Sequence, residues 1–316
     1  MTRPQIDGVL DLHKLEGSTS MDVVRIIKRL TRVKRVGHAG TLDPIATGVL
    51  PVCLGQATRL MEYLVDHHKL YRAEFRLGAA TDTHDAYGTV TSGQDPSGIT
   101  RSQVEALLPV FTGEIQQLPP MYSALKRDGK RLYDLARAGL EVERPTRPVS
   151  VYSLNMVDWS PPLATIEVEC GRGLYVRTLV HDIGAMLGCG AHLSALIRLK
   201  VGPFTVADAV TPDVFEEAVE AGTWEDLLSP PDIALLGHDS VTVTASAEEQ
   251  FRHGQAISLP DVTMYARHLE LRRAYTTDGR FLGVLRFNRA EGIWQPEKVF
   301  ALATPSPYAP SAEPAH

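Results

Sequence analysis

Hydrophobic and polar positions alternate with a period of two along several stretches, and this pattern predicts β-strands. Within residues 69–78, Tyr71 and Phe75 fall on the apolar face, whereas Arg72 and Glu74 fall on the other. The same alternation recurs in residues 6–14, 149–159 and 164–170. Core packing explains an inward Tyr71, but a buried tyrosine hydroxyl needs a partner, so a role in a site stays open.

Apolar residues that recur at spacings of three and four predict helices between these strands. Ser20 is a suitable N-cap for a helix over residues 21–30, whose apolar face is predicted to carry Val23, Ile26, Ile27 and Leu30. Further helices are predicted over residues 57–65, 100–111 and 132–138, and from residue 176 onward. The first 200 residues therefore mix strands and helices.

The pattern changes after residue 207. Residues 208–236 are predicted to form acidic helices, and the pair Pro230-Pro231 marks a boundary. Residues 238–302 consist of short alternating segments separated by Gly, Pro and Asp, which predicts a small all-β domain. Residues 303–316 contain four prolines and are predicted to be a disordered tail.

The formal net charge of −6 hides an asymmetry between the two parts of the chain. Residues 1–200 carry 24 Lys and Arg against 21 Asp and Glu, whereas residues 201–316 carry 8 against 17. A polyanionic partner is therefore not excluded, but the surface that binds it has to be local. Three widely spaced cysteines, with neither a signal-peptide core nor an apolar run of ~18 residues, favour a protein of the reducing cytosol.

The stretch from residue 37 to residue 51 contains three glycines and two prolines around a single acid, Asp43. Glycine permits tight turns and Pro44 disfavours a helix through Asp43, so this carboxylate is predicted to lie on a stiff loop. An unpaired carboxylate in such apolar surroundings is costly. One interpretation is a structural turn in which Asp43 caps a backbone N–H, and the other is a site that uses the carboxylate.

Two basic clusters and one isolated arginine are candidate partners for anions. Six cations lie between Arg25 and Arg35, directly before residue 37, and a second cluster spans residues 126–131. Each cluster is either solvated surface or a contact for nucleic-acid phosphates. Arg177 falls beside the apolar face of the helix from residue 176, at the end where the helix dipole disfavours a cation. We therefore expect Arg177 either to meet an anion or to lie on the surface.

Several well-known catalytic motifs are missing from the sequence. It has no Gly-x-x-x-x-Gly-Lys phosphate loop, no Gly-x-Ser-x-Gly elbow and no His-Glu-x-x-His zinc motif. Cys189 and His192 have the spacing of half a zinc site, but no second pair lies at a suitable distance, so we expect no metal. The remaining candidates are Asp43, Tyr71, Arg177 and the basic clusters.

Residues 37–51 resemble the signature segment of the TruB family of tRNA pseudouridine-55 synthases. Other segments are similar to family blocks and follow in family order, namely residues 69–72, 81–85, 121–126, 173–178 and 189–198. The resemblance covers residues 8 to about 205, and the C-terminal part resembles the PUA-like RNA-binding module of such enzymes. One departure is Leu15, which follows Lys14 where the family usually has a proline, and which leaves that loop less rigid.

The resemblance implies an α+β fold, with a mixed, mainly antiparallel central sheet flanked by helices, as in pseudouridine synthases. Residues 1–235 would form the catalytic domain and residues 238–302 a PUA-like domain. The implied reaction isomerises a uridine, flipped out at position 55 of the tRNA T loop, by exchanging its N1–C1′ bond for a C5–C1′ bond. Nothing is oxidised and no group is lost, so no cofactor is implied.

The resemblance also implies roles for individual residues. Asp43 would be the catalytic carboxylate, which Arg177 keeps ionised and oriented, and Tyr71 would stack on the uracil and help to remove the C5 proton. Three further residues would form the base pocket or fill the space that the flipped base leaves: Tyr175, Leu196 and His38.

Contacts to the phosphates of the T stem-loop would come from Lys14, Arg29, Arg32, Lys126 and Arg127. The implied protein is a cytoplasmic monomer that acts on tRNA without a membrane or an obligatory protein partner. A non-catalytic RNA-binding protein is an alternative, although it would not need Asp43, Tyr71 and Arg177 together. A guide-RNA-dependent relative is a nearer rival, but residues 44–48 are more similar to the stand-alone bacterial type.

Overall fold

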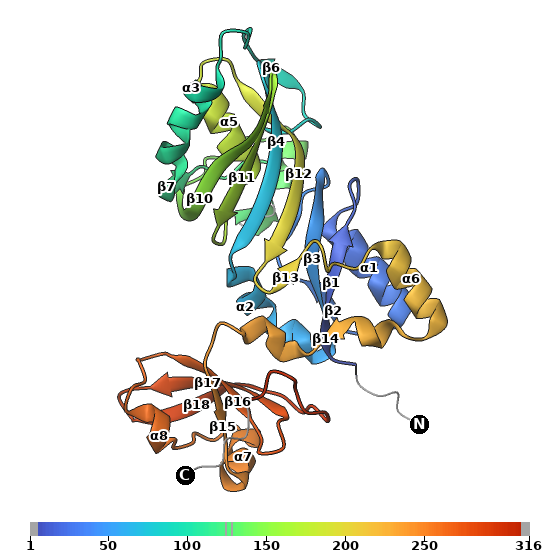
Figure 1. The fold of residues 1–316 in the computed structure, drawn as a ribbon, viewed down its shortest axis with the longest axis vertical. Coiled ribbons are helices and arrows are strands. Elements are labelled where there is room, and N and C mark those ends of the chain that lie inside the picture. Colours follow the sequence, from blue (N-terminus) through green and yellow to red (C-terminus); the bar gives the residue numbers. More distant parts are fainter. Residues whose placement is uncertain (1–5, 124, 128, 311–316) are drawn as a thin grey trace.

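The computed structural model describes residues 6–123, 125–127 and 129–310, without the side chains of Lys126, Arg127, Lys130, Arg131 and Arg137. Most of the chain folds around one large sheet, and a smaller sheet lies beyond one end of it (Figure 1). Within these ranges, no helix has the length and apolar character needed to cross a membrane.

The large sheet confirms the expected mixed, mainly antiparallel arrangement. Its main path runs β14-β1-β3-β12-β4-β11-β10-β7, with β2 added to β3 and β13 to β12. The pair β3–β12 is parallel, and the other pairs are antiparallel. The strands are β1 (Gly8–Lys14), β2 (Val36–His38), β3 (Ala46–Leu54), β4 (Lys69–Leu77), β7 (Gly113–Gln117), β10 (Arg147–Ser160), β11 (Leu163–Cys170), β12 (Ala191–Val201), β13 (Phe204–Thr205) and β14 (Leu228–Ser229).

Helices and two short hairpins complete this part of the chain. The helices are α1 (Ser20–Thr31), α2 (Met61–Asp66), α3 (Arg101–Leu107), α4 (Leu132–Arg137), α5 (Val176–Met186) and α6 (Pro212–Ala221), with 3₁₀ turns η1 (Gly55–Leu60), η2 (Leu108–Phe111), η3 (Trp224–Leu227) and η4 (Pro231–Leu235). The hairpins are β5 (Ala80–Thr81) with β6 (Val90–Ser92), and β8 (Lys126–Arg127) with β9 (Lys130–Arg131). The helices predicted before residue 200 are present, although residues 57–65 and 100–111 each divide between a 3₁₀ turn and an α-helix. Residues 208–236 were predicted to be helical, but they form one α-helix, α6, together with η3, η4 and the strand β14.

The N-cap of α1 differs from the prediction. Thr19 is the cap, because its hydroxyl accepts from the Asp22 N–H while the Asp22 carboxylate accepts from the Thr19 N–H in a capping box. The hydroxyl of Ser20 instead accepts from the Leu42 N–H at 2.9 Å and donates to the Leu42 carbonyl. Ser20 therefore ties α1 to the loop that carries Asp43.

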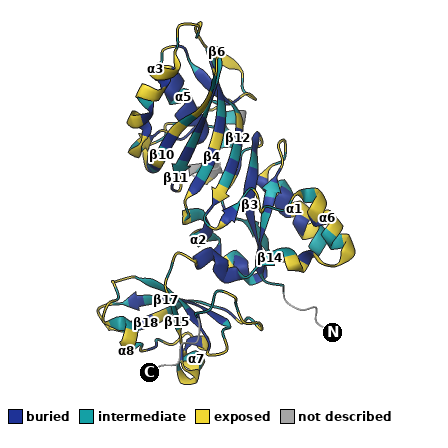
Figure 2. Ribbon diagram, in the orientation of Figure 1, coloured by how far each residue is buried: buried dark blue, intermediate teal, exposed yellow. Residues whose placement is uncertain are grey.

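The sheet separates two hydrophobic cores, and the alternation along β1 and β3 determines which side chain enters which core. Leu50 and Val52 of β3 pack with α1, α3, α5 and α6, whereas Val49 and Cys53 face the second core. The second core also contains η1, α2, η4 and residues of the small sheet. Along β4, buried residues alternate with partly or fully exposed ones (Figure 2). Tyr71 is one of the buried residues, as predicted.

The small sheet has the order β15-β16-β17-β18, formed by β15 (Ser240–Thr242), β16 (Leu271–Tyr275), β17 (Phe281–Asn288) and β18 (Ile293–Val299). The domain was predicted to be all-β, but it also contains α7 (Ala245–Arg252) and the short α8 (Pro260–Thr263). Thr244 caps α7, and Ala247 and Phe251, four residues apart, pack on the sheet. Residues 256–259 form only an isolated bridge, between Ile257 and Trp294.

Residues 303–310, predicted to be part of a disordered tail, instead make defined contacts. Residues up to 310 pack against the small sheet: Pro305 bridges to Arg280, and the Ser306 hydroxyl donates to the buried Asp232 carboxylate at 2.6 Å. The Tyr275 hydroxyl donates to the same carboxylate at 2.7 Å. Residues 311–316 lie outside the described part. Separate domains over residues 1–235 and 238–302 stay a prediction, and the two parts share the second core.

Candidate active site

Asp43 lies in the loop between β2 and β3, and the side chain of a buried lysine binds the backbone of this loop. Lys14, at the end of β1, is fully buried, and its ammonium donates to the carbonyls of Ala46 at 2.6 Å and Pro44 at 3.4 Å. Burial lowers the pKa of Lys14 to about 8, although the nearby Asp43 opposes this shift. Lys14 is therefore not the exposed RNA contact that the sequence predicted, because its ammonium is directed into its own chain.

A second buried cation anchors the same loop from β12. Arg198 is 1% exposed, and its guanidinium donates to the carbonyls of Val49 at 2.7 Å and Gly40 at 3.0 Å. Gly48 pairs with Arg198 in the parallel β3–β12 contact with φ +95°, and an added Cβ would lie 2.3 Å from the Arg198 carbonyl oxygen. Only glycine fits this close approach, so the stiffness expected of residues 37–51 has a structural cause.

Arg177 and Asp43 form a bidentate ion pair, which confirms the expectation that this arginine faces an anion. The Nε and Nη2 atoms of Arg177 lie 2.7 and 3.2 Å from the two Asp43 oxygens. The remaining donors reach the carbonyls of Thr83 and Tyr122, both at 2.9 Å. The Arg177 side chain is 3% exposed, whereas that of Asp43 is 32% exposed. The carboxylate is thus held on one side and open on the other.

A second carboxylate, which sequence reasoning missed, lies on the other side of Arg177. Asp85 is buried, and its Oδ2 is 3.5 Å from Nη1 of Arg177. Its Oδ1 accepts from the Thr83 hydroxyl at 2.6 Å and from the Tyr87 N–H at 3.1 Å. In the sequence, local turns explain the polar residues 81–85 as well as a binding site does. The signal that could have pointed to a site was the second acid in that stretch. The guanidinium is therefore held between two acids.

Tyr71 and Leu196 lie on neighbouring strands next to this pair. Both are buried, and the β4–β12 register places Tyr71 opposite Arg198 and Leu196 opposite Ala73. Burial raises the pKa of Tyr71, the charge of Arg198 opposes this rise, and the charge of Asp43 adds to it.

Tyr175 is the residue before α5, and Gln117 fixes its backbone. The Gln117 amide accepts from the Tyr175 N–H at 2.8 Å and donates to the Tyr175 carbonyl at 3.0 Å. Burial raises the pKa of the Tyr175 hydroxyl, the charge of Asp43 adds to this rise, and the charges of Arg177 and Arg147 oppose it. The aromatic side chain therefore lies beside the ion pair.

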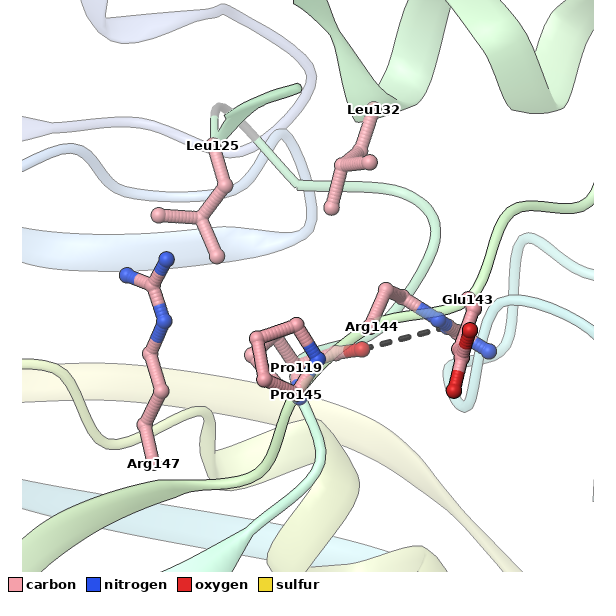
Figure 3. A pocket seen from close by; sticks show the side chains of 7 residues that line it. All are labelled: Pro119, Leu125, Leu132, Glu143, Arg144, Pro145 and Arg147. Atoms are coloured by element: carbon pink, nitrogen blue, oxygen red, sulfur yellow. Dashed lines mark hydrogen bonds between the residues drawn. The ribbon is translucent and has the colours of Figure 1, made fainter. Parts of the chain in front are cut away.

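A hollow of about 480 Å³ adjoins this region (Figure 3). Its lining residues are Pro119, Leu125, Leu132, Glu143, Arg144, Pro145 and Arg147. Arg147 pairs with Gln117 across β7 and β10, which connects the hollow to Tyr175. Figure 3 shows the Arg147 side chain extending toward Leu125, and Arg144 donates to the Pro119 carbonyl at 3.1 Å. The hollow thus combines apolar walls with two cations.

The other residues singled out in the sequence lie at the edge of the site or on the surface. His38 ends β2, and its Nδ1 is buried without a hydrogen-bond partner among the described residues. Burial, and to a smaller extent the charge of Arg198, lowers the pKa of His38. Among the basic residues predicted to bind RNA, Arg29 and Arg32 are exposed at the end of α1. The side chains of Lys126 and Arg127 are outside the described part.

The described residues contain no group of three or more His, Cys, Asp or Glu arranged to bind a metal ion. What the geometry does offer is one carboxylate on a rigid loop, oriented by an arginine and flanked by two tyrosines. Such a carboxylate can act as a nucleophile, or it can stabilise positive charge on a substrate that lies against its open side.

Comparisons with known proteins agree with this arrangement. Residues 28–176 match the family model of the TruB family pseudouridylate synthase N-terminal domain, and residues 177–235 match that of the tRNA pseudouridylate synthase B C-terminal domain. A tRNA pseudouridine synthase B of Dechloromonas aromatica is 44% identical over 95% of this chain and 97% of its own length. Its counterpart from Symbiobacterium thermophilum is 48% identical over 80% of this chain and 83% of its own length.

Solved structures show the same fold. The protein matched in a crystal structure of a Cbf5-Nop10-Gar1 complex is 26% identical, with a TM-score of 0.72 over 93% of this chain and 85% of that one. A chain of an H/ACA RNP bound to a substrate RNA containing 2′-deoxyuridine is 24% identical, with a TM-score of 0.70 over 96% of this chain and 87% of its own, and supports the fold alone. The family models together span most of the chain, and the relatives exceed 40% identity over nearly all of it. This chain therefore belongs to the TruB family of pseudouridylate synthases.

Proposed function

We propose that this protein is a tRNA pseudouridine synthase that isomerises a uridine flipped out of the T loop at position 55, with Asp43 as the catalytic carboxylate. The observation that carries the proposal is the ion pair of Arg177 with Asp43, which leaves that carboxylate partly open to a substrate. Membership of the family supplies the reaction class, an isomerisation. The names of the relatives supply tRNA as the substrate.

Asp43 performs its role next to the sugar and the base of the bound uridine. The N1–C1′ bond breaks, the uracil turns, and C5 bonds to C1′, after which C5 loses its proton and N1 carries one. Arg177 keeps Asp43 ionised and aimed through two charge-assisted hydrogen bonds, so no reorganisation is needed when charge develops. Because the product is an isomer of the substrate, the reaction requires no oxidant, reductant or group carrier.

The residues around Asp43 form the base pocket in this proposal. Tyr71 stacks on the uracil and helps to remove the C5 proton, while Tyr175 and Leu196 line the walls. His38 occupies the space in the RNA that the flipped base leaves. Its lowered pKa supports this role, because a neutral imidazole enters a base stack without a buried charge.

The RNA surface in this proposal runs from α1 past the open side of Asp43. Arg29 and Arg32 grip phosphates of the T stem-loop, together with Lys126 and Arg127 of the hairpin β8–β9. The hollow lined by Arg144 and Arg147 lies next to Tyr175, which suits a nucleotide adjacent to the target. We propose that the protein acts in the cytoplasm as a monomer.

The test is conversion of a bare tRNA transcript that carries tritium at C5 of its uridines. Wild-type protein is expected to release tritium without added protein or guide RNA, and Asp43→Asn is expected to release none while tRNA affinity stays near wild type. Asp66→Asn, which removes an exposed carboxylate paired with Arg172, serves as the control and should behave like wild type. Tight binding without release by the wild type would favour a non-catalytic RNA-binding protein. Release that requires a guide RNA would favour the guide-dependent alternative.

A further inference from the structure

Arg198 is a buried cation that forms no ion pair among the described residues. Its guanidinium lies in the middle of the large sheet at 1% exposure, and no carboxylate lies within ion-pair distance of it in the described part of the chain. Arg177, by contrast, lies between two acids. A buried charge that lacks a counter-charge is costly to the folded state, so its presence calls for a role other than stability.

The acceptors of Arg198 are backbone carbonyls on both sides of Asp43. Gly40 lies three residues before Asp43, and Val49 lies six residues after it. An ideal Cβ on Gly40 would lie 3.4 Å from Nη1 of Arg198, so the guanidinium packs directly against the turn of the loop. The position of the loop is therefore coupled to the position of this one side chain.

The same guanidinium also acts on Tyr71. Arg198 and Tyr71 are register partners on β12 and β4, so their side chains are cross-strand neighbours on one face of the sheet. The positive charge of Arg198 opposes the rise in the pKa of Tyr71 that burial causes. One side chain thus bonds to the loop of Asp43 and lies beside the tyrosine expected to stack on the base.

We propose that Arg198 is a positioning residue for the isomerisation, which locks the loop of Asp43 in place beside Tyr71 and so sets the spacing of carboxylate and ring around the uracil. This inference rests on the proposed function. Loss of this positioning should displace the Asp43 carboxylate and the Tyr71 ring relative to each other. Small displacements of reacting groups reduce rates steeply. RNA affinity should be spared, because the phosphate contacts lie elsewhere.

The test compares Arg198→Met and Arg198→Lys with a matched control in the small sheet, Arg273→Met. Arg273 also donates to neutral acceptors, the His238 carbonyl and the Tyr275 hydroxyl, both at 3.0 Å. Single-turnover rates at saturating tRNA, tRNA Kd and Tm are measured for each variant. We expect Arg198→Met to slow the step by about tenfold or more with Kd changed by less than about threefold. Arg198→Lys should lie in between, and Arg273→Met should lower Tm alone.

A double-mutant cycle with Tyr71→Phe separates positioning from folding. If Arg198 and Tyr71 act together, the rate reduction caused by Arg198→Met should be smaller in the Tyr71→Phe background. Should Arg198→Met fail to fold, the same cycle is run with Arg198→Lys. A Tm decrease like that of Arg273→Met with an unchanged rate per folded molecule would overturn the inference, as would strict additivity with Tyr71→Phe. Absence of tritium release by the wild type would instead overturn the proposed function.

Discussion

At the scale of single residues, three buried cations organise the surroundings of Asp43 in different ways. Arg177 pairs with the carboxylate itself, whereas Lys14 and Arg198 hold the carbonyls of the loop that carries it. Each cation makes several hydrogen bonds in a fixed direction, which a long exposed side chain does not do. The carboxylate is consequently oriented before any substrate arrives.

Replacing Arg177 with Met should affect rate and stability together. The change leaves Asp43 and the buried Asp85 without their shared partner, so we expect turnover to fall by about a hundredfold and Tm to drop. The matched control is Arg72→Met, which breaks an exposed ion pair in which two Arg72 donors share one Glu167 oxygen, and which should cost less than about 1 kcal/mol. Single-turnover rate and Tm are measured for both. Equal, small effects would refute a special role for Arg177.

His84 should make stability depend on pH. Its ring stacks on His181 at 3.8 Å, and burial, His181, Arg177 and Arg144 lower its pKa from 6.5 to about 4. Between these values the unfolded state binds more protons, so this group should reduce stability as pH falls from 6.5 toward 4, by on the order of 1 kcal/mol. His84→Asn, which tolerates the observed φ of +64°, should flatten that slope in denaturation curves measured at several pH values. An unchanged slope would show that other groups dominate.

At the scale of elements, one face of α1 packs on the large sheet and the other is exposed to solvent. Val23, Val24 and Ile27 are buried against the sheet, and Ser20 bonds to the loop of Asp43. The opposite face and the C-terminal turn expose Lys28, Arg29 and Arg32. The helix therefore links a basic surface directly to the candidate active site.

Reversing Lys28, Arg29 and Arg32 to Glu should weaken tRNA binding and flatten its salt dependence. A phosphate that the variant cannot neutralise keeps its condensed counterions, so the slope of log Kd against log salt should fall by about one for each such phosphate. The control is Arg101→Glu, at the start of α3, which lies far from α1 along the sheet (Figure 1). Binding isotherms at several salt concentrations measure the effect. Identical slopes for wild type and triple variant would remove α1 from the RNA surface.

At the scale of the whole molecule, the small sheet is attached through a shared core and not only through a linker. Tyr275, Phe281 and Phe300 pack in one cluster with Val49, Leu60 and other residues of the large-sheet part. The carboxylate of Asp232, in η4, accepts from Tyr275 and Ser306. Removal of the small sheet therefore exposes apolar surface on the remaining part.

Two truncated chains, one with and one without η4, should differ in stability, because η4 belongs to the large-sheet part. A chain that ends at residue 237 keeps Ile233, Ala234 and Leu235 in the second core, so we expect it to fold with a lower Tm, to retain catalysis and to bind tRNA more weakly. A chain that ends at residue 230 lacks these three residues and should be markedly less stable. Tm and single-turnover rate are measured for both. An insoluble 1–237 chain would show that the small sheet is required for folding.

Periodicity predicted the strands β1, β4, β10 and β11 and most of the helices, because elements that bury one face leave a pattern in the chain. The central strands β3 and β12 were not predicted. Along β3 nearly every residue is buried, so this strand has no polar face to alternate with. The inward face of Tyr71 and the need of Arg177 for an anion followed from the same local reasoning, and the motif of residues 37–51 pointed to Asp43. The helix α7 was missed, because its few apolar residues are short of a full helical stripe. Local patterns, together with the family resemblance, therefore identified most of the helices, part of the large sheet and the central pair of Asp43 and Arg177.

Only the tertiary structure decided which cations are buried. Lys14 and Arg198 carry the same charges as the surface residues of α1, and nothing local to either one distinguishes a loop anchor from an RNA contact. Asp85 likewise becomes part of the site only because the stretch of residues 81–85 packs against the start of α5. Long-range packing decides desolvation, and desolvation decides whether a charged side chain binds its own chain or a partner.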